Sequence, residues 1–233
     1  MPPKDPASVP KLNPPESEPP SPSGSRSWWQ NQRENVLTIL LALLLAFGIR
    51  TFVAEARWIP SDSMLPTLEE GDRLVVEKIS YRFSSPERGD IIVFNPPAKL
   101  NFDGAYIKRV IGLPGERLRI EDGKVFINGI PLQEDYIYAP PNYSCPGERC
   151  PGVRVQGSDF VVPPASYFVM GDNRNDSQDS HVWGFLPEDN IIGNTIFRFW
   201  PLNRLHFFAT QEYPELPSEA QVLRNPTTQD GGN

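Results

Sequence analysis

The pattern of apolar and polar positions divides the chain into four parts. Residues 1–35 are rich in proline and serine, and such a stretch buries too little apolar surface to offset its ordering entropy. We predict that it is disordered, with a proline-rich ligand for a partner protein as the alternative. An apolar run at residues 36–54 predicts a transmembrane anchor, and short apolar runs at 55–209 predict a folded domain. Residues 210–233 are polar and predict a flexible tail.

The apolar run has two interpretations. Its strictly uncharged part, Val36–Ile49, is short for a membrane span, and Ala54-Glu55-Ala56 has the small-x-small form of a signal-peptide cleavage site. Including Arg50, whose charge can reach the headgroups, gives about 19 residues, roughly the thickness of a bilayer. Trp28 and Trp29 suit the membrane–water interface. We favour a retained anchor over a cleaved signal peptide.

The region after residue 56 has the pattern of antiparallel β structure. Its apolar runs are short, rich in β-branched residues and bounded by glycine, aspartate and proline. The predicted strands are Arg73–Ile79, Asp90–Phe94, Ala105–Gly112, Arg117–Ile120, Lys124–Ile127, Asp159–Val162, Tyr167–Met170 and Thr195–Trp200. Because no long helical period follows residue 56, we expect a mainly β fold, with antiparallel coiled sheets or a partly closed barrel.

Composition narrows the classes of protein. The hydrophobic share of 39% suffices for a core but not for a multi-span membrane protein. A net charge of −7 disfavours non-specific nucleic-acid binding, so we expect no nucleic-acid partner. The two histidines and two cysteines are too few for an ordinary zinc site unless carboxylates complete it. If the domain is in a reducing compartment, Cys145 and Cys150 would remain unpaired thiols. If it is exported, a disulfide across this short loop is expected, and we hypothesise that the two cysteines are bridged.

The segment Pro60–Leu68 carries a candidate nucleophile. Its two prolines restrict the backbone, and Ser61 and Ser63, two residues apart, point the same way in an extended chain. The segment is either an ordinary loop or a rigid support for a reactive serine, which needs a base. His206 lies among apolar neighbours and is more simply a packed residue, while His181 is a weak candidate for the base.

Lys108 is the other candidate base. Strand alternation puts it on one face with Tyr106 and Val110, and an apolar environment can lower a lysine pKa enough for the amine to act as a base. The alternative is a lysine that reaches solvent from a strand end. The polar segment Gly171–Ser180 could be a solvated loop, but it also offers a hydroxyl to hold the amine and carboxylates to pair with arginines.

Four stretches resemble, in order, the conserved boxes of the bacterial type I signal peptidases, or leader peptidases, and the resemblance extends from the apolar run to about Trp200. These stretches are Pro60–Leu68, Arg88–Phe94, Tyr106–Glu116 and Gly171–Ser180. The resemblance implies that Ser63 is the nucleophile and Lys108 the general base. It implies that Ser61 joins the Ser63 N–H in the oxyanion hole and that Ser177 orients the lysine amine.

Further residues match supporting positions of that family. Asp179, Arg174 and Arg109 resemble residues that support the polar cluster. The last box commonly ends in Asp-Ser-Arg, whereas this chain has Asp179-Ser180-His181, which puts one structural salt bridge in doubt. The resemblance also implies a substrate-binding cleft that admits small side chains. Its predicted lining residues are Ile59, Met64, Leu68, Leu74, Tyr106 and Ile107.

What the resemblance implies about function is specific. We expect a membrane-anchored serine endopeptidase on the exported side of a membrane, with no metal or cofactor. Its partners would be the lipid bilayer and the signal peptides of exported preproteins, cut after small residues. A self-cleaving Ser–Lys regulator and an anchored β-domain that binds exported proteins without cutting them are the alternatives. The presence of both Ser63 and Lys108 favours the protease.

Overall fold

The computed structural model describes residues 28–100, 104–145, 150, 155–156 and 159–216. The chain divides into two compact units, Met1–Leu45 and Ala46–Asn233, which are described separately below.

The N-terminal helix α1 (Trp28–Phe52) is apolar along most of its length. Its segment Gln32–Phe52 contains an 18-residue window with a mean hydropathy of 2.0, and among the described residues it is the one helix long and apolar enough to cross a membrane. The predicted disordered segment lies outside the described residues up to residue 27, but residues 28–35 are helical. The helix begins early because no proline or glycine interrupts the sequence between residues 27 and 48.

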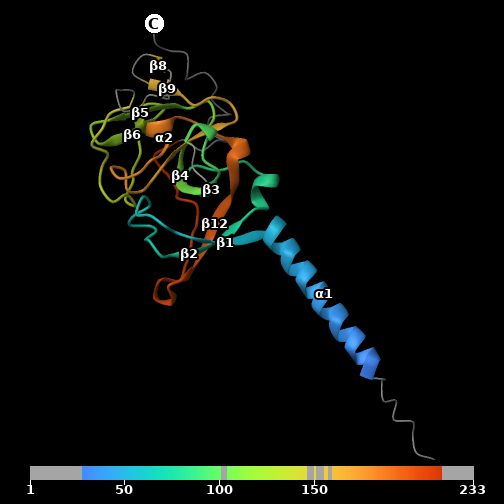
Figure 1. The fold of residues 1–233 in the computed structure, drawn as a ribbon. Helices are drawn as coiled ribbons and strands as arrows, with labels where there is room; N and C mark the ends of the chain where they lie inside the picture. Colours follow the sequence, from blue (N-terminus) through green and yellow to red (C-terminus); the bar gives the residue numbers. More distant parts are fainter. Residues whose placement is uncertain (1–27, 101–103, 146–149, 151–154, 157–158, 217–233) are drawn as a thin grey trace, which may run out of the picture. The chain divides into compact units, whose positions relative to one another are not determined.

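The larger sheet is antiparallel and forms the main body of the second unit (Figure 1). Its strands follow the order β1 (Ala54–Trp58), β2 (Arg73–Glu77), β12 (Ile191–Trp200), β3 (Ile91–Phe94), β4 (Tyr106–Gly112), β10 (Ser166–Met170) and β11 (Leu186–Pro187), and β13 (His206–Phe207) pairs with β12. Strands β3 and β4 are buried on both faces, which explains the continuous apolar sequence of β3; in β4 the buried Lys108 and Arg109 interrupt the apolar residues.

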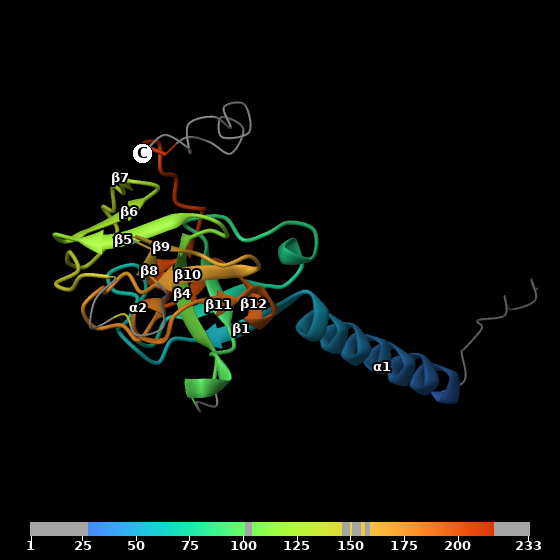
Figure 2. The same cartoon turned by 90° about the horizontal axis from the view of Figure 1, so that it is seen from above.

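A second antiparallel sheet lies at one end of this unit, away from β1 and β12 (Figures 1 and 2). Its order is β7 (Ile130–Pro131), β6 (Lys124–Ile127), β5 (Arg117–Glu121), β9 (Asp159–Val161) and β8 (Val155–Gln156). The β5–β6 hairpin turns at Asp122 and Gly123, whose φ values of 50° and 75° suit a tight two-residue turn.

The helices of this unit are single turns. They are α2 (Ser180–Trp183) and the 3-10 turns η1 (Ser80–Arg82), η2 (Ala98–Leu100), η3 (Glu188–Asn190) and η4 (Leu202–Arg204). The prediction of a mainly β fold with antiparallel coiled sheets and one N-terminal apolar helix is confirmed. Five strands were not predicted, because they are either two residues long or, like β1, carry charged side chains between small ones.

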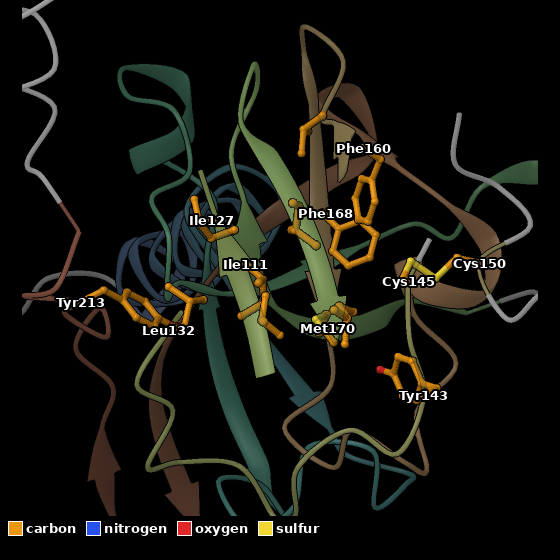
Figure 3. Close-up of a cluster of buried hydrophobic side chains, with 14 residues drawn as sticks. Ile111, Ile127, Leu132, Tyr143, Cys145, Cys150, Phe160, Phe168, Met170 and Tyr213 are labelled. Carbon is orange, nitrogen blue, oxygen red and sulfur yellow. A yellow bond between two sulfur atoms is a disulfide. The ribbon is translucent and has the colours of Figure 1, made fainter. Parts of the chain in front are cut away.

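Three clusters of buried side chains form the core. One joins the two sheets and contains Ile111, Leu118, Phe160 and Phe168 (Figure 3). A second lies under the Pro60–Leu68 segment. Its members are Ile59, Met64, Leu68, Leu74, Val76, Ile91, Val93 and Ile107. The third surrounds Phe94, Val110 and Trp183.

The chain after residue 209 continues along the domain. Thr210 Oγ1 donates to Asp90 Oδ1 at 2.8 Å, and the Tyr213 hydroxyl lies 2.6 Å from that of Tyr136. Glu215 accepts a hydrogen bond from the Gln133 N–H. The packed region therefore extends to residue 216, beyond the boundary expected from the polar composition, because Tyr213 supplies a buried aromatic side chain.

The junction between α1 and the sheet is part of the β ladder. Ala54 pairs with Glu77, and Ala56 pairs with Val75. Between them, Glu55 makes an ion pair of 2.6 Å with Lys78. The small-x-small sequence is thus built into the edge strand β1.

Candidate active site

Ser63 lies in the connection between β1 and β2. Met64 and Leu68 on the same segment have no exposed surface, and the Leu68 N–H donates to the Met64 carbonyl at 2.9 Å. These two apolar side chains fix the segment to the core beneath it, while Ser63 stays partly exposed. The segment therefore presents one hydroxyl from a well-packed turn.

Lys108 on β4 is almost fully buried, with 4% of its surface exposed. Its Nζ lies 2.7 Å from Ser63 Oγ and donates to the Ile107 carbonyl at 2.9 Å. Burial lowers the pKa of Lys108 to about 8, although the negative charges of Asp179 and Asp172 oppose the shift. Lys108 does not reach solvent, and its amine lies within hydrogen-bond distance of the Ser63 hydroxyl.

Two further serines were expected at this site. Ser61 Oγ is exposed and lies 3.4 Å from Ser63 Oγ, on the same side of the segment. Ser177 is buried in the same region, but its hydroxyl has no hydrogen-bond partner among the described residues. The expected contact between Ser177 and the Lys108 amine is not among the hydrogen bonds of the described residues, in which the amine contacts Ser63 Oγ and the Ile107 carbonyl. The Ser177 hydroxyl instead helps to keep the pKa of Asp179 low.

Gly171 lies between the serines. A Cβ atom at this position would lie 2.3 Å from Ser177 Oγ and 2.3 Å from the Ser63 carbonyl oxygen. Only a glycine allows β10 and the Ser63 segment to approach this closely. The sequence analysis did not single out Gly171, since a glycine after a strand usually marks a turn.

A groove of about 590 Å³ opens over the two catalytic candidates. It is lined by Pro60, Ser61, Asp62, Ser63, Ala105, Tyr106, Ile107, Lys108, Asn175, Asp176, Ser177 and Gln178. All four residues expected in the chemistry thus share one groove. Tyr106 and Ile107, predicted to contact substrate, also line it.

The other four residues predicted to line the cleft do not do so. Met64, Leu68 and Leu74 have no exposed surface and Ile59 has 2%, and all four belong to the core cluster under the Ser63 segment. Apolar side chains next to a reactive serine can serve either a binding cleft or the core, and here they form the core. Their contribution is to hold the segment in place.

Two buried arginines, Arg109 and Arg174, form ion pairs that fix the start of the polar segment Gly171–Ser180. Arg109 binds Asp172 through two contacts, Nε–Oδ1 at 2.8 Å and Nη2–Oδ2 at 2.6 Å. Arg174, fully buried, binds Glu134 at 2.7 and 2.6 Å and also donates to the Gly171 carbonyl at 3.1 Å. Bidentate pairing of this kind fixes both partners geometrically, so Arg109 and Arg174 hold the backbone from Gly171 to Arg174.

Asp179 and His181 form a third buried pair. His181 Nδ1 lies 2.7 Å from Asp179 Oδ1, and Asp179 Oδ2 accepts a hydrogen bond from the Gly171 N–H at 2.9 Å. Burial alone would raise the pKa of Asp179, but the hydrogen bond and charge of His181 outweigh it and hold this pKa below its usual range. His181 therefore supplies the partner of Asp179, so this ion pair is formed without the arginine that the resemblance led us to expect.

Neither histidine contacts Ser63. The His181 ring stacks on Tyr143, with ring centroids 4.2 Å apart. His206, expected to be packed, is instead exposed, with its ring edge against Phe208. Within the described residues, no three His, Cys, Asp or Glu side chains lie close enough to hold a metal ion.

The two cysteines are joined. Cys145 and Cys150 form a disulfide with a Cα–Cα distance of 5.6 Å, and Cys145 bridges to Ile120 in the smaller sheet. Figure 3 shows the disulfide and Tyr143 on the same side of the core cluster.

A serine hydroxyl within hydrogen-bond distance of a buried lysine amine, at the base of a groove in a β-sheet domain, is the arrangement of a serine hydrolase that uses lysine as its base. The family described as "Signal peptidase, peptidase S26" matches residues 32–200. The chain belongs to this family of serine endopeptidases, of which a Ser–Lys dyad is a general property.

Named relatives are similar over most of the chain. A protein called probable signal peptidase I-1 from Synechocystis sp. is 55% identical over 181 residues, covering 76% of this chain and 86% of the relative. Signal peptidase I from Leptolyngbya laminosa is 55% identical over 177 residues, covering 74% and 81%. Thylakoidal processing peptidase 1 from Arabidopsis thaliana is 36% identical over 192 residues, covering 77% of this chain and 53% of that protein.

Proposed function

We propose that this chain removes signal peptides from exported preproteins by acyl-enzyme catalysis, with Ser63 as nucleophile and Lys108 as general base. The observation that carries the proposal is the 2.7 Å contact between Lys108 Nζ and Ser63 Oγ, made by an amine that is 4% exposed. Burial lowers the pKa of Lys108 to about 8, so near physiological pH far more of the amine is neutral than for an ordinary lysine, and the neutral share grows as the pH rises.

The chemistry follows from this contact. Ser63 Oγ attacks the carbonyl carbon at the cut site while its proton moves to Lys108 Nζ. The C–N bond then breaks, the ammonium returns the proton to the leaving amine, and the signal peptide stays on Ser63 as an ester. Water attacks that ester, with Lys108 again taking the proton, and releases the signal peptide as a carboxylate.

The oxyanion formed in each step needs hydrogen-bond donors. Ser61 Oγ is exposed beside Ser63 Oγ at 3.4 Å, and the Ser63 backbone N–H donates no hydrogen bond within the described part of the chain. Both donors are therefore available to a substrate oxygen. Asp179, Arg174 and Arg109 act on the chemistry by holding the surrounding backbone.

Substrate selection is proposed to favour small residues before the cut. The groove is lined by three backbone segments, residues 60–63, 105–108 and 175–178. An extended peptide that lies between these backbone segments can form main-chain hydrogen bonds with them. We propose that the space left in the groove beside such a peptide is too shallow for bulky side chains. Alanine at the first and third positions before the cut fits this arrangement.

The proposed location is a membrane, with the β domain on the exported side. Helix α1 supplies one span of suitable length and hydropathy. The disulfide between Cys145 and Cys150 suits an oxidising compartment. The substrates would thus be signal peptides inserted in the membrane. Their cut sites would emerge at the membrane surface, where the helix anchors the β domain.

Cleavage of a purified preprotein by the full chain in detergent micelles tests the proposal. Wild type should give one product whose mass places the cut after an Ala-x-Ala sequence, and phenylalanine at the residue before the cut should block it. Ser63→Ala and Lys108→Ala should each lower the rate by about a thousandfold or more, with circular dichroism unchanged. Ser84→Ala, an exposed serine outside the groove, is the matched control and should cleave normally.

Turnover by Ser63→Ala at the wild-type rate would refute the dyad. Binding of the preprotein without cleavage by wild type would instead favour a non-catalytic domain that holds exported proteins.

A further inference from the structure

We propose that His181, held by Tyr143, is a positioning residue that fixes the Asp179 carboxylate and thereby sets the pH range in which Lys108 acts as a base. The inference rests on the proposed function, because its readout is the cleavage reaction. It goes beyond that function in assigning roles to an imidazole and an aromatic ring that do not contact Ser63.

The first step is the geometry of Asp179. Its Oδ1 receives two contacts from His181, from Nδ1 at 2.7 Å and from the backbone N–H at 3.1 Å, and its Oδ2 receives the Gly171 N–H at 2.9 Å. Asp179 has no exposed surface. Both carboxylate oxygens of Asp179 therefore accept hydrogen bonds, and a shift of the His181 imidazole would change the position of the carboxylate.

Second, Gly171 connects Asp179 to the segment that carries Ser63. Gly171, which donates to Asp179, has no room for a side chain because Ser177 Oγ and the Ser63 carbonyl oxygen lie on either side of it. The Ser63 carbonyl accepts from the Asn173 N–H at 3.1 Å. A displacement of Gly171 would thus be transmitted to the segment that carries the nucleophile.

The third step explains why the imidazole has one orientation. Its ring lies 4.2 Å from the Tyr143 ring at an interplanar angle of 19°, and both residues are buried. Tyr143 is two residues before Cys145, which is tied to Ile120 by a β-bridge and to Cys150 by the disulfide (Figure 3). The stacking partner is therefore itself held in place by the smaller sheet.

Fourth, the charge at position 181 also affects the protonation of Lys108. The charged groups that act on Lys108 are Asp179 and Asp172, both from the segment after β10, while Asp179, Arg174 and Glu134 act on the neighbouring Tyr143. Of these, Asp179 and Asp172 favour the ammonium form of Lys108. A positive charge at position 181 would offset the Asp179 carboxylate and favour the neutral amine, so a permanent cation at this position would shift the working range of the base to lower pH.

Three substitutions separate placement from charge. His181→Phe keeps a ring for Tyr143 but removes the donor to Asp179, and kcat should fall about tenfold, the loss expected for one charge-assisted hydrogen bond, with KM nearly unchanged. His181→Asn restores a donor near the Nδ1 position without a charge, and it should recover most of kcat. His181→Arg adds a permanent cation, and its rate should rise with pH at least about half a pH unit earlier than that of His181→Asn.

The experiment measures kcat and KM for cleavage by the full chain in detergent between pH 6 and 10 (on the order of ten pH values suffices to fit the rise). His206→Gln, a change at the exposed histidine, is the matched control and should behave as wild type. Tyr143→Leu leaves His181 intact but removes the stacked ring, and it should also lower kcat. This variant decides the matter if the His181 variants fail to fold.

Wild-type kcat and an unchanged pH profile in His181→Phe would overturn the inference, as would identical pH profiles for His181→Asn and His181→Arg. Wild-type behaviour of Tyr143→Leu would overturn the role of the stacked ring. If wild type cleaves, Ser63→Ala does not, and the His181 variants match wild type, this inference fails while the proposed function stands. If wild type itself does not cleave, the proposed function fails as well.

Discussion

Replacing Lys108 by methionine should change stability in a way that depends on pH. Burial lowers the pKa of this amine from 10.5 to about 8, and at about 1.4 kcal/mol per pKa unit the folded state bears a cost of about 3 kcal/mol for a charged Lys108 at neutral pH. Methionine fills a similar space and carries no charge. It also loses two hydrogen bonds, to Ser63 Oγ and the Ile107 carbonyl, worth about 1 kcal/mol each. Near pH 7 the variant should therefore be more stable by about 1 kcal/mol.

The difference in stability between Lys108→Met and wild type reverses its sign at alkaline pH. Below pH 8 the lysine is charged in both the folded and the unfolded state, so the cost is constant. Between pH 8 and 10.5 the unfolded chain binds the proton and the folded chain does not, so the free energy of unfolding of wild type rises with pH relative to the variant. By about pH 10.5 wild type should be the more stable protein by about 2 kcal/mol.

Urea unfolding of the full chain in a mild detergent, followed by the fluorescence of the buried Trp183, measures this difference at several pH values. Lys124→Met, at an exposed lysine in β6, is the control and should differ from wild type by a constant amount over the same range. A difference between Lys108→Met and wild type that does not change from pH 7 to pH 10.5 would refute the reasoning, because it would mean that Lys108 has the same pKa in both states.

Two further predictions concern the backbone around the site. Gly171→Ala should lower stability by about 1–3 kcal/mol and cleavage by more than tenfold, because its Cβ would meet Ser177 Oγ and the Ser63 carbonyl oxygen at 2.3 Å; normal activity would contradict the close approach. Denatured protein from its native compartment should show no free thiol before reduction and two after it, and replacing Cys145 and Cys150 by serine should cost about 2 kcal/mol. Two free thiols before reduction would disprove the bridge.

The sequence was informative about the dyad because each member has a local signal. Ser63 lies between two prolines, and Lys108 alternates with apolar residues along one strand. Glu134 and Asp172 were missed, although each binds a buried arginine. Their partners lie 40 and 63 residues away in sequence, and no local pattern records a pairing that forms only when distant strands pack together.

The substrate cleft was predicted less well for a related reason. Apolar residues beside a nucleophile have the same sequence appearance whether they line a groove or fill the core beneath it. Leu68 and Leu74 are fully buried, whereas Tyr106 and Ile107 line the groove. Strand β1 was missed because Glu55 and Arg57 alternate with small residues, and their charges are paired within and next to the strand rather than exposed as in a loop.

The position of Ala54-Glu55-Ala56 has a consequence for the lifetime of the chain. A peptide can reach a protease groove only when its backbone is extended and free, but each of these three residues is paired with β2. Cutting after Ala56 would first require the edge strand to separate from the sheet and the Glu55–Lys78 ion pair to break. Resistance to autoproteolysis is then set by the free energy of this local opening rather than by the sequence at the cut. With the proposed preference for small residues, the protein would thus carry such a site at the end of its own apolar helix and remain intact.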